Sequence, residues 1–474
     1  MIETDHSPAA GPPECDAPVD AHAAALPPAV GRSKGRIRVP LAPERTLRDF
    51  HRSDGPDLLA KCRALHSYVR QLEREGSYQS LYRVTLTSGL DHRIRVLDPR
   101  SGREVEMICF DSNSYLGLHL HPRVIAAVKR ALDRVGYGTP SAPLLCGTNR
   151  YLRELEETVA RFHAREDAMV FPSGYAANVG VLTALLRERD LVVMDCFSHA
   201  SIHDGAKASG ARQCRSFPHR DLTCLNRLLS EAGDGGGKLI VTDGVFSMHG
   251  TLAPLAGLRA LATQHGALLL VDEAHATGVI GQAGRGLEEK CGLPGAIDVL
   301  VGTFSKAPGA AGGYVCGSRE LVTYLRFFAR PGMFTAALPA ATCAGLTEAF
   351  RVMEGEPEHR ERLWRNVRVL APALIEAGLC VPRDVESPIL PVFLGSSQLL
   401  RRFSQDLFAS GIKCGNVSYP AVRRGEAVAR LAVNARHTPE DLGRAVEVFT
   451  RLGRKYGILH RDREEIREIG DRLV

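Results

Sequence analysis

The sequence predicts an α/β protein with two domains: a large one with a mostly parallel sheet sandwiched by helices, and a smaller C-terminal α+β one. Through the middle third of the chain, short apolar runs of strand length alternate with helical stretches. Apolar strands that alternate with helices belong to parallel sheets covered on both faces. After Pro339 the pattern changes, and 474 residues are enough for both domains.

Residues 1–45 are rich in proline, alanine and glycine and show little hydrophobic periodicity, which predicts a flexible tail. Residues 46–110 are expected to hold an N-terminal helix and two short strands. The helix is expected over 55–76, where apolar residues recur at helical spacing. The strands are expected over 92–98 and 104–110.

The large domain is expected over residues 111–355. A loop at 113–118 leads to a helix at 122–135, whose N-terminal proline suits a first turn. Ligands of parallel sheets bind beyond the carboxyl ends of the strands. The strands are expected at 168–171, 191–195, 215–217, 239–242, 267–272 and 299–303, with helices at 178–186, 222–229 and 255–265.

The small domain is expected over residues 356–474. Two helices, at 341–353 and 360–376, lead into it. The elements expected beyond them are strands at 389–394, 412–414 and 429–433, a helix at 439–452, and a solvated terminal helix at 460–474.

The composition narrows the function classes. The formal net charge of +6 is small for this length and is spread along the chain, so it gives little reason to expect nucleic-acid binding. The 12 cysteines are scattered singly, without zinc or disulfide spacing, which favours a reducing cytoplasm. No run of about 18 apolar residues and no apolar leader occurs, so neither a membrane span nor a signal peptide is expected.

Lys306 stands where a buried strand gives way to a glycine-rich turn containing Gly309, Gly312 and Gly313. Such a setting suits a lysine that forms a Schiff base, because an apolar, crowded environment disfavours the ammonium form and lowers its pKa. A lone lysine in a loop is more often simply solvated. The interpretation therefore depends on matching residues elsewhere.

Polar residues follow the carboxyl ends of several predicted strands. Residues 172–176 open a helix, whose first backbone amides can hold a phosphate. His199, Ser247 and His275 each follow a strand, and Asp272 is the last residue of one. A buried acid at a strand end needs a partner, and a protonated ring nitrogen would be one. Pyridoxal phosphate chemistry requires such an aspartate together with a lysine.

Three other interpretations compete with a cofactor site. The D-E-A-H run at 272–275 also occurs in helicases, but no G-x-x-x-x-G-K-[ST] motif precedes it. His199 and His203 have i, i+4 spacing without an H-E-x-x-H pattern, so no metal site is expected. Asp272 could merely cap a helix, but its combination with Lys306 favours the cofactor interpretation.

Six short motifs follow one another in order: N-S-Y-L-G-L at 113–118, S-G-Y-A-A-N at 173–178, S-H-A-S at 198–201, G-V-F-S-M-H-G at 244–250, D-E-A-H-A-T-G at 272–278 and T-F-S-K at 303–306. Together they resemble the α-oxoamine synthases, pyridoxal-phosphate enzymes of fold type I that include serine palmitoyltransferase and 8-amino-7-oxononanoate synthase. The resemblance extends from about residue 83 to about residue 452. Among the family members, the chain most resembles bacterial serine palmitoyltransferases.

The resemblance implies pyridoxal phosphate as the cofactor and assigns residues to it. Lys306 would carry the cofactor and act as general base, and Asp272 would pair with the pyridine nitrogen. The other expected partners are His199 on the ring face, Ser247 and His275 near the phenolic oxygen, and Ser173, Gly174, Tyr175 and Thr303 around the phosphate.

Asn113 and Arg430 resemble the family's ligands for the carboxylate of the amino acid, and a guanidinium fork suits that group. Thr335 lies in a segment resembling the one that reaches the phosphate of the neighbouring subunit, which implies a homodimer with shared sites.

One segment departs from the family. At 138–148 this chain has Pro143 where the family usually has an arginine, near the acyl entrance.

The expected reaction is the decarboxylative condensation of serine, alanine or glycine with an acyl thioester, carried by coenzyme A or an acyl carrier protein. The product would be an α-amino ketone. Another fold-type-I enzyme, such as an aminotransferase, is the alternative, since fold and cofactor do not fix the reaction. A non-catalytic subunit is a third possibility, against which the retained Lys306 argues.

Overall fold

The computed structural model describes residues 47–51, 57–98, 101–233 and 235–471, so the predicted tail at 1–45 lies outside the described residues. A seven-stranded sheet has the strand order β3-β9-β8-β7-β6-β4-β5. β9 runs antiparallel to both of its neighbours, β3 and β8, and the remaining pairs are parallel. The strands are β3 (Asp167–Phe171), β4 (Leu191–Asp195), β5 (Gln213–Phe217), β6 (Lys238–Asp243), β7 (Leu268–Asp272), β8 (Val299–Thr303) and β9 (Gly313–Gly317).

The mostly parallel sheet and its six predicted strands are confirmed, whereas β9 was not predicted. The glycines before β9 indicate a turn and conceal the short strand behind it. Gly313 opens β9 because the backbone there passes very close to the chain after β3. A Cβ atom at Gly313 would lie 2.5 Å from both the carbonyl carbon of Ser173 and the nitrogen of Gly174.

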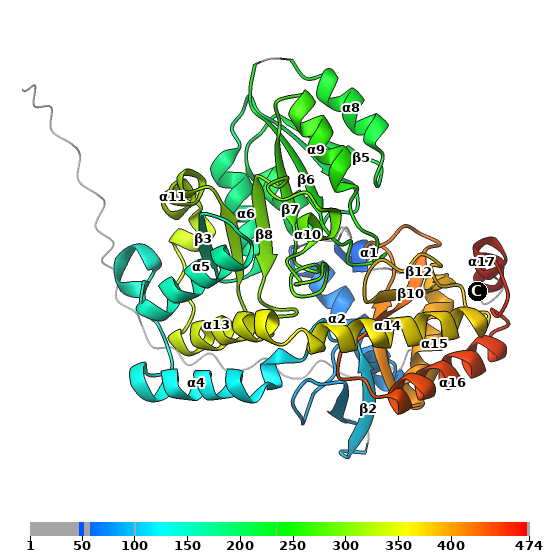
Figure 1. The fold of residues 1–474 in the computed structure, drawn as a ribbon. Coiled ribbons are helices and arrows are strands. Elements are labelled where there is room, and N and C mark those ends of the chain that lie inside the picture. Colours follow the sequence, from blue (N-terminus) through cyan, green and yellow to red (C-terminus); the bar gives the residue numbers. More distant parts are fainter. Residues whose placement is uncertain (1–46, 52–56, 99–100, 234, 472–474) are drawn as a thin grey trace, which may run out of the picture. The chain divides into compact units, whose positions relative to one another are not determined.

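Alternate residues of the strands point to opposite faces of the sheet, and each face has its own hydrophobic core. One face is covered by α6 (Gly174–Leu185), α7 (Ala200–Ala208), α11 (Arg319–Phe328) and α12 (Arg330–Met333). The other is covered by α5 (Arg150–Phe162), α8 (Leu222–Ser230), α9 (Leu255–Gln264), α10 (Leu287–Cys291) and α13 (Ala340–Gly355). Figure 1 shows α4 (Pro122–Val135) lying alongside α13.

A second sheet combines strands from both ends of the chain in the order β1-β2-β11-β12-β10. β2 pairs in parallel with β11, so the strands before the large sheet hydrogen-bond to the C-terminal strands. The strands are β1 (Arg93–Leu97), β2 (Glu104–Phe110), β10 (Ile389–Gly395), β11 (Ile412–Val417) and β12 (Ala427–Ala432). The domain boundaries at 110 and 355 stay a prediction.

The remaining helices lie before and after the large sheet in the sequence. α16 (Pro439–Lys455) begins at a capping box, in which Thr438 and Asp441 satisfy each other's backbone N–H groups. Asp441 also accepts a hydrogen bond of 2.9 Å from Nε of Arg93 in β1. The other helices are α1 (Leu47–His51), α2 (Ala60–Glu75), α3 (Tyr78–Leu81), α14 (Glu358–Glu376), α15 (Ser397–Ala409) and α17 (Arg463–Asp471).

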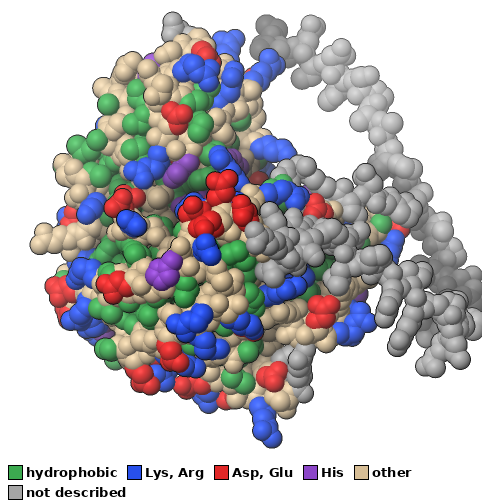
Figure 2. Space-filling view, turned by 90° about the vertical axis from the view of Figure 1, so that its right-hand side faces the viewer, with side chains coloured by type: hydrophobic (Ala, Val, Ile, Leu, Met, Phe, Trp, Pro, Cys, Tyr) green, Lys and Arg blue, Asp and Glu red, His purple; other side chains and the backbone are tan. Residues whose placement is uncertain are grey.

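The surface carries both signs of charge. On the face drawn in Figure 2, lysine and arginine side chains are interspersed with aspartate and glutamate. Among the described helices, none has a stretch long and apolar enough to cross a lipid bilayer.

Candidate active site

Lys306 lies three residues beyond the end of β8 and is partly buried. Loss of hydration on burial lowers the pKa of its amine from 10.5 to about 8, although the carboxylates of Asp272 and Asp243 act in the opposite direction. Arg430 adds to the lowering. The amine can therefore shed its proton near neutral pH, as a Schiff-base lysine must.

Asp272 ends β7 and is buried with both carboxylate oxygens hydrogen-bonded. Oδ1 accepts the backbone N–H of Ala274 at 2.9 Å, and Oδ2 accepts Nδ2 of Asn178 in α6 at 2.7 Å. These two donors fix the plane of the carboxylate. Asn178 lies within the predicted motif at 173–178, but its role was not predicted. Nothing in the motif shows that α6 brings this side chain to the end of β7.

Asp243 is a second buried acid beside Lys306, and the sequence prediction missed it. It ends β6 and pairs in register with Asp272 on the neighbouring strand. Burial and the nearby Asp272 carboxylate raise the pKa of Asp243 well above its usual value, which favours its neutral form. Its Oδ1 accepts the backbone N–H of His199 at 3.0 Å. The argument used for Asp272, an acid ending an apolar strand, applies equally to Asp243.

His199 precedes α7 and is held by Ser201. Its Nδ1 lies 2.7 Å from Oγ of Ser201 and accepts the backbone N–H of the same residue at 3.3 Å. Ser201 Oγ in turn accepts Nδ2 of Asn178 at 2.9 Å. A chain of hydrogen bonds therefore joins His199 to Asp272 through Ser201 and Asn178. Burial lowers the pKa of His199, so its ring is neutral at pH 7.

The turn between β3 and α6 has the features of a phosphate-binding site. Ser173 caps α6, and its Oγ accepts the N–H of Ala176 at 3.0 Å. Gly174 lies against Thr303 so closely that a Cβ there would be 2.9 Å from Cβ of Thr303. Tyr175 is half-exposed, and its hydroxyl donates to Asp204. The free N–H groups of the first helical turn provide the donors that an anion needs.

Arg430 lies in β12 and reaches the large sheet from the small one. Its Nη2 donates to Oδ1 of Asn113 at 3.0 Å, and its Nε donates to the backbone oxygen of Ser247 at 2.6 Å. The guanidinium is buried and also acts on the pKa of Lys306. The structure thus brings the predicted carboxylate ligands to the amine.

His275 is buried close enough to Lys306 and Arg430 for their charges to act on its ring. Its Nδ1 lies 2.7 Å from the hydroxyl of Tyr115, a residue that the sequence prediction did not assign. Burial, with further contributions from Lys306 and Arg430, lowers the pKa of His275 well below its usual value.

Thr335 is the predicted site residue that lies apart from this group. It is exposed beyond the end of α12, and its hydroxyl donates to the backbone oxygen of Pro331 at 2.8 Å. Pro143 begins the helical turn η2 (Pro143–Gly147), which borders a pocket of about 220 Å³. The apolar lining of this pocket includes Pro143, Leu144, Leu152, Met169, Gly332 and Met333.

The assembled residues fit pyridoxal phosphate. Three features lie at the carboxyl edge of the sheet: the Lys306 amine with its lowered pKa, the buried and oriented carboxylate of Asp272, and the capped N-terminus of α6. Oγ of Ser198, next to His199, is buried without a hydrogen-bond partner in the part of the chain that the structure describes. Buried polar atoms of this kind indicate a site for a polar ligand.

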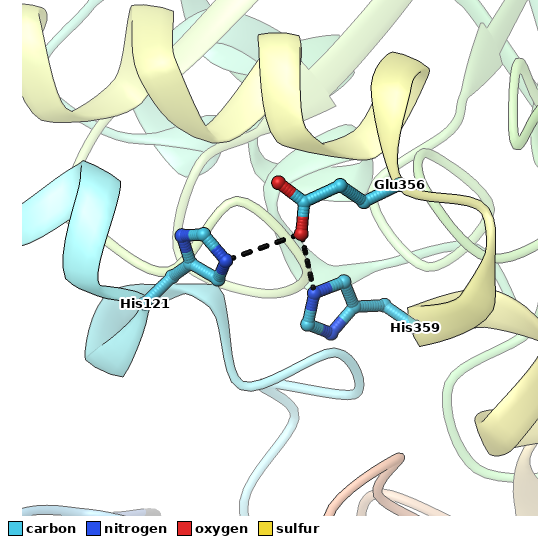
Figure 3. A group of neighbouring side chains, drawn as sticks. All are labelled: His121, Glu356 and His359. Carbon is cyan, nitrogen blue, oxygen red and sulfur yellow. Dashed lines mark hydrogen bonds and ion pairs between the residues drawn. The ribbon is translucent and has the colours of Figure 1, made fainter.

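A separate cluster of His121, Glu356 and His359 lies where α4, α13 and α14 meet (Figure 3). Nε2 of each histidine lies 3.2 to 3.3 Å from one oxygen of Glu356. The other ring nitrogens face donors, since Nδ1 of His121 accepts the backbone N–H of Arg123 and Nδ1 of His359 accepts Nη2 of Arg362. The His359 ring therefore carries its proton on Nε2 and donates it to Glu356, whereas Nε2 of His121 lies within ion-pair distance of the same oxygen. Metal ligation would need the opposite arrangement.

The lowered pKa of Lys306 leads to a prediction for the protein without cofactor. With a pKa of about 8, about one Lys306 amine in ten is neutral at pH 7, against about one in three thousand for a pKa of 10.5. Labelling by an amine-reactive reagent should therefore rise with pH and reach half its maximum near pH 8. Peptide mass spectrometry measures it, with the exposed Lys290 as an internal reference. A Lys306 profile that coincides with that of Lys290 would contradict the prediction.

Comparison with known proteins gives consistent matches. Residues 105–449 match the family model described as aminotransferase class I and II. The 8-amino-7-oxononanoate synthase 1 of Bacillus velezensis is 40% identical over 75% of this chain and 92% of that protein. The 4-hydroxy-2,2'-bipyrrole-5-methanol synthase PigH of Serratia sp. is 37% identical over 89% of this chain, which spans only 64% of that longer relative. A structure of a lysine-to-alanine variant of serine palmitoyltransferase from S. paucimobilis, with a bound PLP–myriocin aldimine, superposes with a TM-score of 0.80 and 33% identity. The match covers 85% of this chain and 100% of that one.

Proposed function

The chain belongs to the α-oxoamine synthase family of pyridoxal-phosphate enzymes with fold type I, and we propose that its amino-acid substrate is serine, alanine or glycine. It is an acyltransferase that uses pyridoxal phosphate to condense an amino acid with an acyl thioester. The proposed product is an α-amino ketone, formed with loss of carbon dioxide. The observation that supports the proposal is the hydrogen bond between the buried Arg430 and the partly buried Asn113 near Lys306, since this pair would hold a carboxylate next to the reactive amine.

The residues divide the chemistry among themselves. When bound, pyridoxal phosphate supplies an electron sink for the charge left at the α-carbon. Arg430 and Asn113 hold the carboxylate of the amino acid, and this grip decides which bond of the α-carbon is perpendicular to the ring and therefore breaks. Lys306 removes the α-proton as general base, for which a pKa of about 8 is well matched to neutral pH. Asp272, oriented by Asn178, keeps the proton on the ring nitrogen.

The acyl side of the site is assigned to the segment at 138–148. Pro143 gives this segment no cation where the family usually has an arginine. The adjoining pocket is lined mainly by apolar residues, and its lining also contains Arg153, Glu156 and Arg326. An apolar acyl chain suits such a surface better than a charged one does. The thiol carrier is proposed to be coenzyme A or an acyl carrier protein.

A homodimer with shared active sites is proposed on the basis of Thr335 and its surroundings. Large apolar side chains are exposed around α4, η2, α11 and α12, where a soluble monomer would be expected to show few. They include Tyr137 at 87%, Leu145 at 78%, Phe334 at 66%, Phe327 at 55% and Phe328 at 53% exposure. We also propose a cytoplasmic location, which suits the free thiols of the described cysteines.

One experiment tests the reaction. The purified protein, loaded with pyridoxal phosphate, is incubated with each of the three amino acids and a panel of acyl thioesters that differ in chain length and carrier. Thiol release is measured by absorbance and the products by mass spectrometry. We expect one amino acid to give thiol release together with a product whose mass equals the sum of the amino acid and the acyl thioester less carbon dioxide and the free thiol.

The matching family model also includes aminotransferases, so an aminotransferase is the second candidate. The same incubations, repeated with a 2-oxo acid in place of the thioester, separate the two reactions. Transfer of the amino group to the 2-oxo acid without any thiol release in the thioester series would sink the condensation proposal. Thiol release without amino transfer would exclude the alternative.

A further inference from the structure

Tyr115 has a backbone conformation that is rare for an aromatic residue. Its φ is 45°, in the left-handed region, and its side chain is fully buried. A bulky residue is strained in this conformation, and such strain persists only where the surroundings enforce it. The backbone oxygen of Tyr115 is held by the N–H of Ala435 at 2.6 Å. This geometry aims the hydroxyl at Nδ1 of His275, 2.7 Å away.

The direction of the Tyr115–His275 hydrogen bond follows from Arg430. Burial raises the pKa of the Tyr115 hydroxyl to about 12, while the positive charge of the nearby Arg430 acts in the opposite direction. A positive charge attracts the lone pairs of the hydroxyl oxygen and repels its proton. The proton of Tyr115 is therefore directed away from Arg430 and toward Nδ1 of His275, 2.7 Å from the hydroxyl oxygen.

The ring of His275 then has a single possible tautomer. Burial and the neighbouring cations keep its pKa well below the usual value, so the imidazole is neutral. A neutral imidazole carries one N–H, and Nδ1 is occupied as an acceptor. The proton of His275 is consequently on Nε2.

We propose that Tyr115 is a positioning residue, which fixes His275 as the Nε2–H tautomer so that this N–H acts as a permanent donor to the phenolic oxygen of the cofactor. The proposal rests on the pyridoxal-phosphate site described above. Tyr115 acts only through His275, because its hydroxyl hydrogen-bonds to Nδ1 of that histidine and leaves Nε2 to face the proposed cofactor. A hydrogen-bond donor at the phenolic oxygen stabilises the ionised form of that oxygen.

The test is the absorbance spectrum of the Tyr115→Phe holoenzyme, recorded without substrate. The phenyl ring keeps the packing and loses only the hydroxyl. We expect absorbance to move from the visible band of the ionised phenolic oxygen toward the near-ultraviolet band of the neutral form, with kcat reduced about tenfold. Because the spectrum needs no turnover, this result is independent of whether the proposed condensation occurs.

Tyr314→Phe is the matched control. Tyr314 is also fully buried, and its hydroxyl lies 2.9 Å from Nε2 of His163 and 2.8 Å from Oγ1 of Thr277. Its loss should lower the melting temperature about as much as the loss of the Tyr115 hydroxyl, without changing the spectrum. An unchanged Tyr115→Phe spectrum, or an equal spectral change in Tyr314→Phe, would overturn the proposal.

A second pair of variants keeps the test decisive if Tyr115→Phe folds poorly. The side-chain amide of glutamine can place an N–H donor near the position of the Nε2–H group of histidine, whereas that of asparagine reaches only to about Nδ1. We therefore expect His275→Gln to retain more of the visible band than His275→Asn. The reverse order would refute the assignment of the proton to Nε2.

Discussion

Substitution of Lys306 by alanine is expected to abolish amino-acid-dependent thiol release, lowering kcat by about 10³-fold or more. The amine is both the proposed group that carries the cofactor and the proposed base, and its charge interacts with that of Asp243. The visible absorbance of the loaded protein should change at the same time, because the covalent link to the protein is lost.

Lys290→Ala is the control for this experiment, since Lys290 is exposed in α10. It should retain both the spectrum and the rate of the unmodified protein. If Lys306→Ala kept the wild-type spectrum, the assignment of the cofactor-bearing lysine would be wrong, irrespective of the reaction catalysed.

Asp272→Asn is expected to produce the second large effect, a loss of kcat of about 10³-fold. The amide has the shape of the carboxylate but no charge with which to hold a proton on the ring nitrogen. Steady-state kinetics with the preferred substrates measures the loss. Exchange of the α-proton for deuterium in heavy water measures how fast that proton is removed. Slower exchange in the variant would show that stabilisation of the charge at the α-carbon is the step that is impaired.

Asp243→Asn should cost much less, within about tenfold, because burial and the Asp272 carboxylate raise the pKa of Asp243 well above its usual value and so favour the neutral form, which asparagine resembles. The asparagine oxygen can still accept the backbone N–H of His199, as Oδ1 of Asp243 does. Two adjacent aspartates, paired in register, are thus predicted to lose very different amounts of activity on the same substitution. Equal losses in both variants would contradict the assignment of the charge to Asp272 alone.

The sequence predicted the large sheet well because its strands are continuous apolar runs that end in polar residues. Asp272 and Lys306 were recognisable because an acid or an amine at such a strand end needs a reason to be there. β9 was not predicted because glycines at its start indicate a turn. Gly313 is needed there because the backbone passes very close to Ser173 and Gly174. A sequence pattern does not report such an approach.

The residues that position others were the ones missed. Asn178 and Ser201 are small polar residues within helices, where their usual reading is ordinary helix surface. Their function depends on which strand the helix crosses, and only the three-dimensional arrangement supplies that. Tyr115 gives a weaker signal still, since an aromatic residue between Ser114 and Leu116 indicates a core position, and its positive φ cannot be read from the sequence.

The second sheet, built from strands of both chain ends, has a consequence for the order of folding. The hydrogen bonds Arg93–Asp441 and Arg430–Asn113 join residues 348 and 317 positions apart. Contacts of such long range form late, because the loop that separates them must first be closed. The large sheet, with its sequential strands, can assemble during synthesis, whereas the carboxylate site must wait for β12. A ribosome-bound chain that stops before β12 would therefore contain Lys306 and Asp272 but lack Arg430, the side chain expected to grip the amino acid.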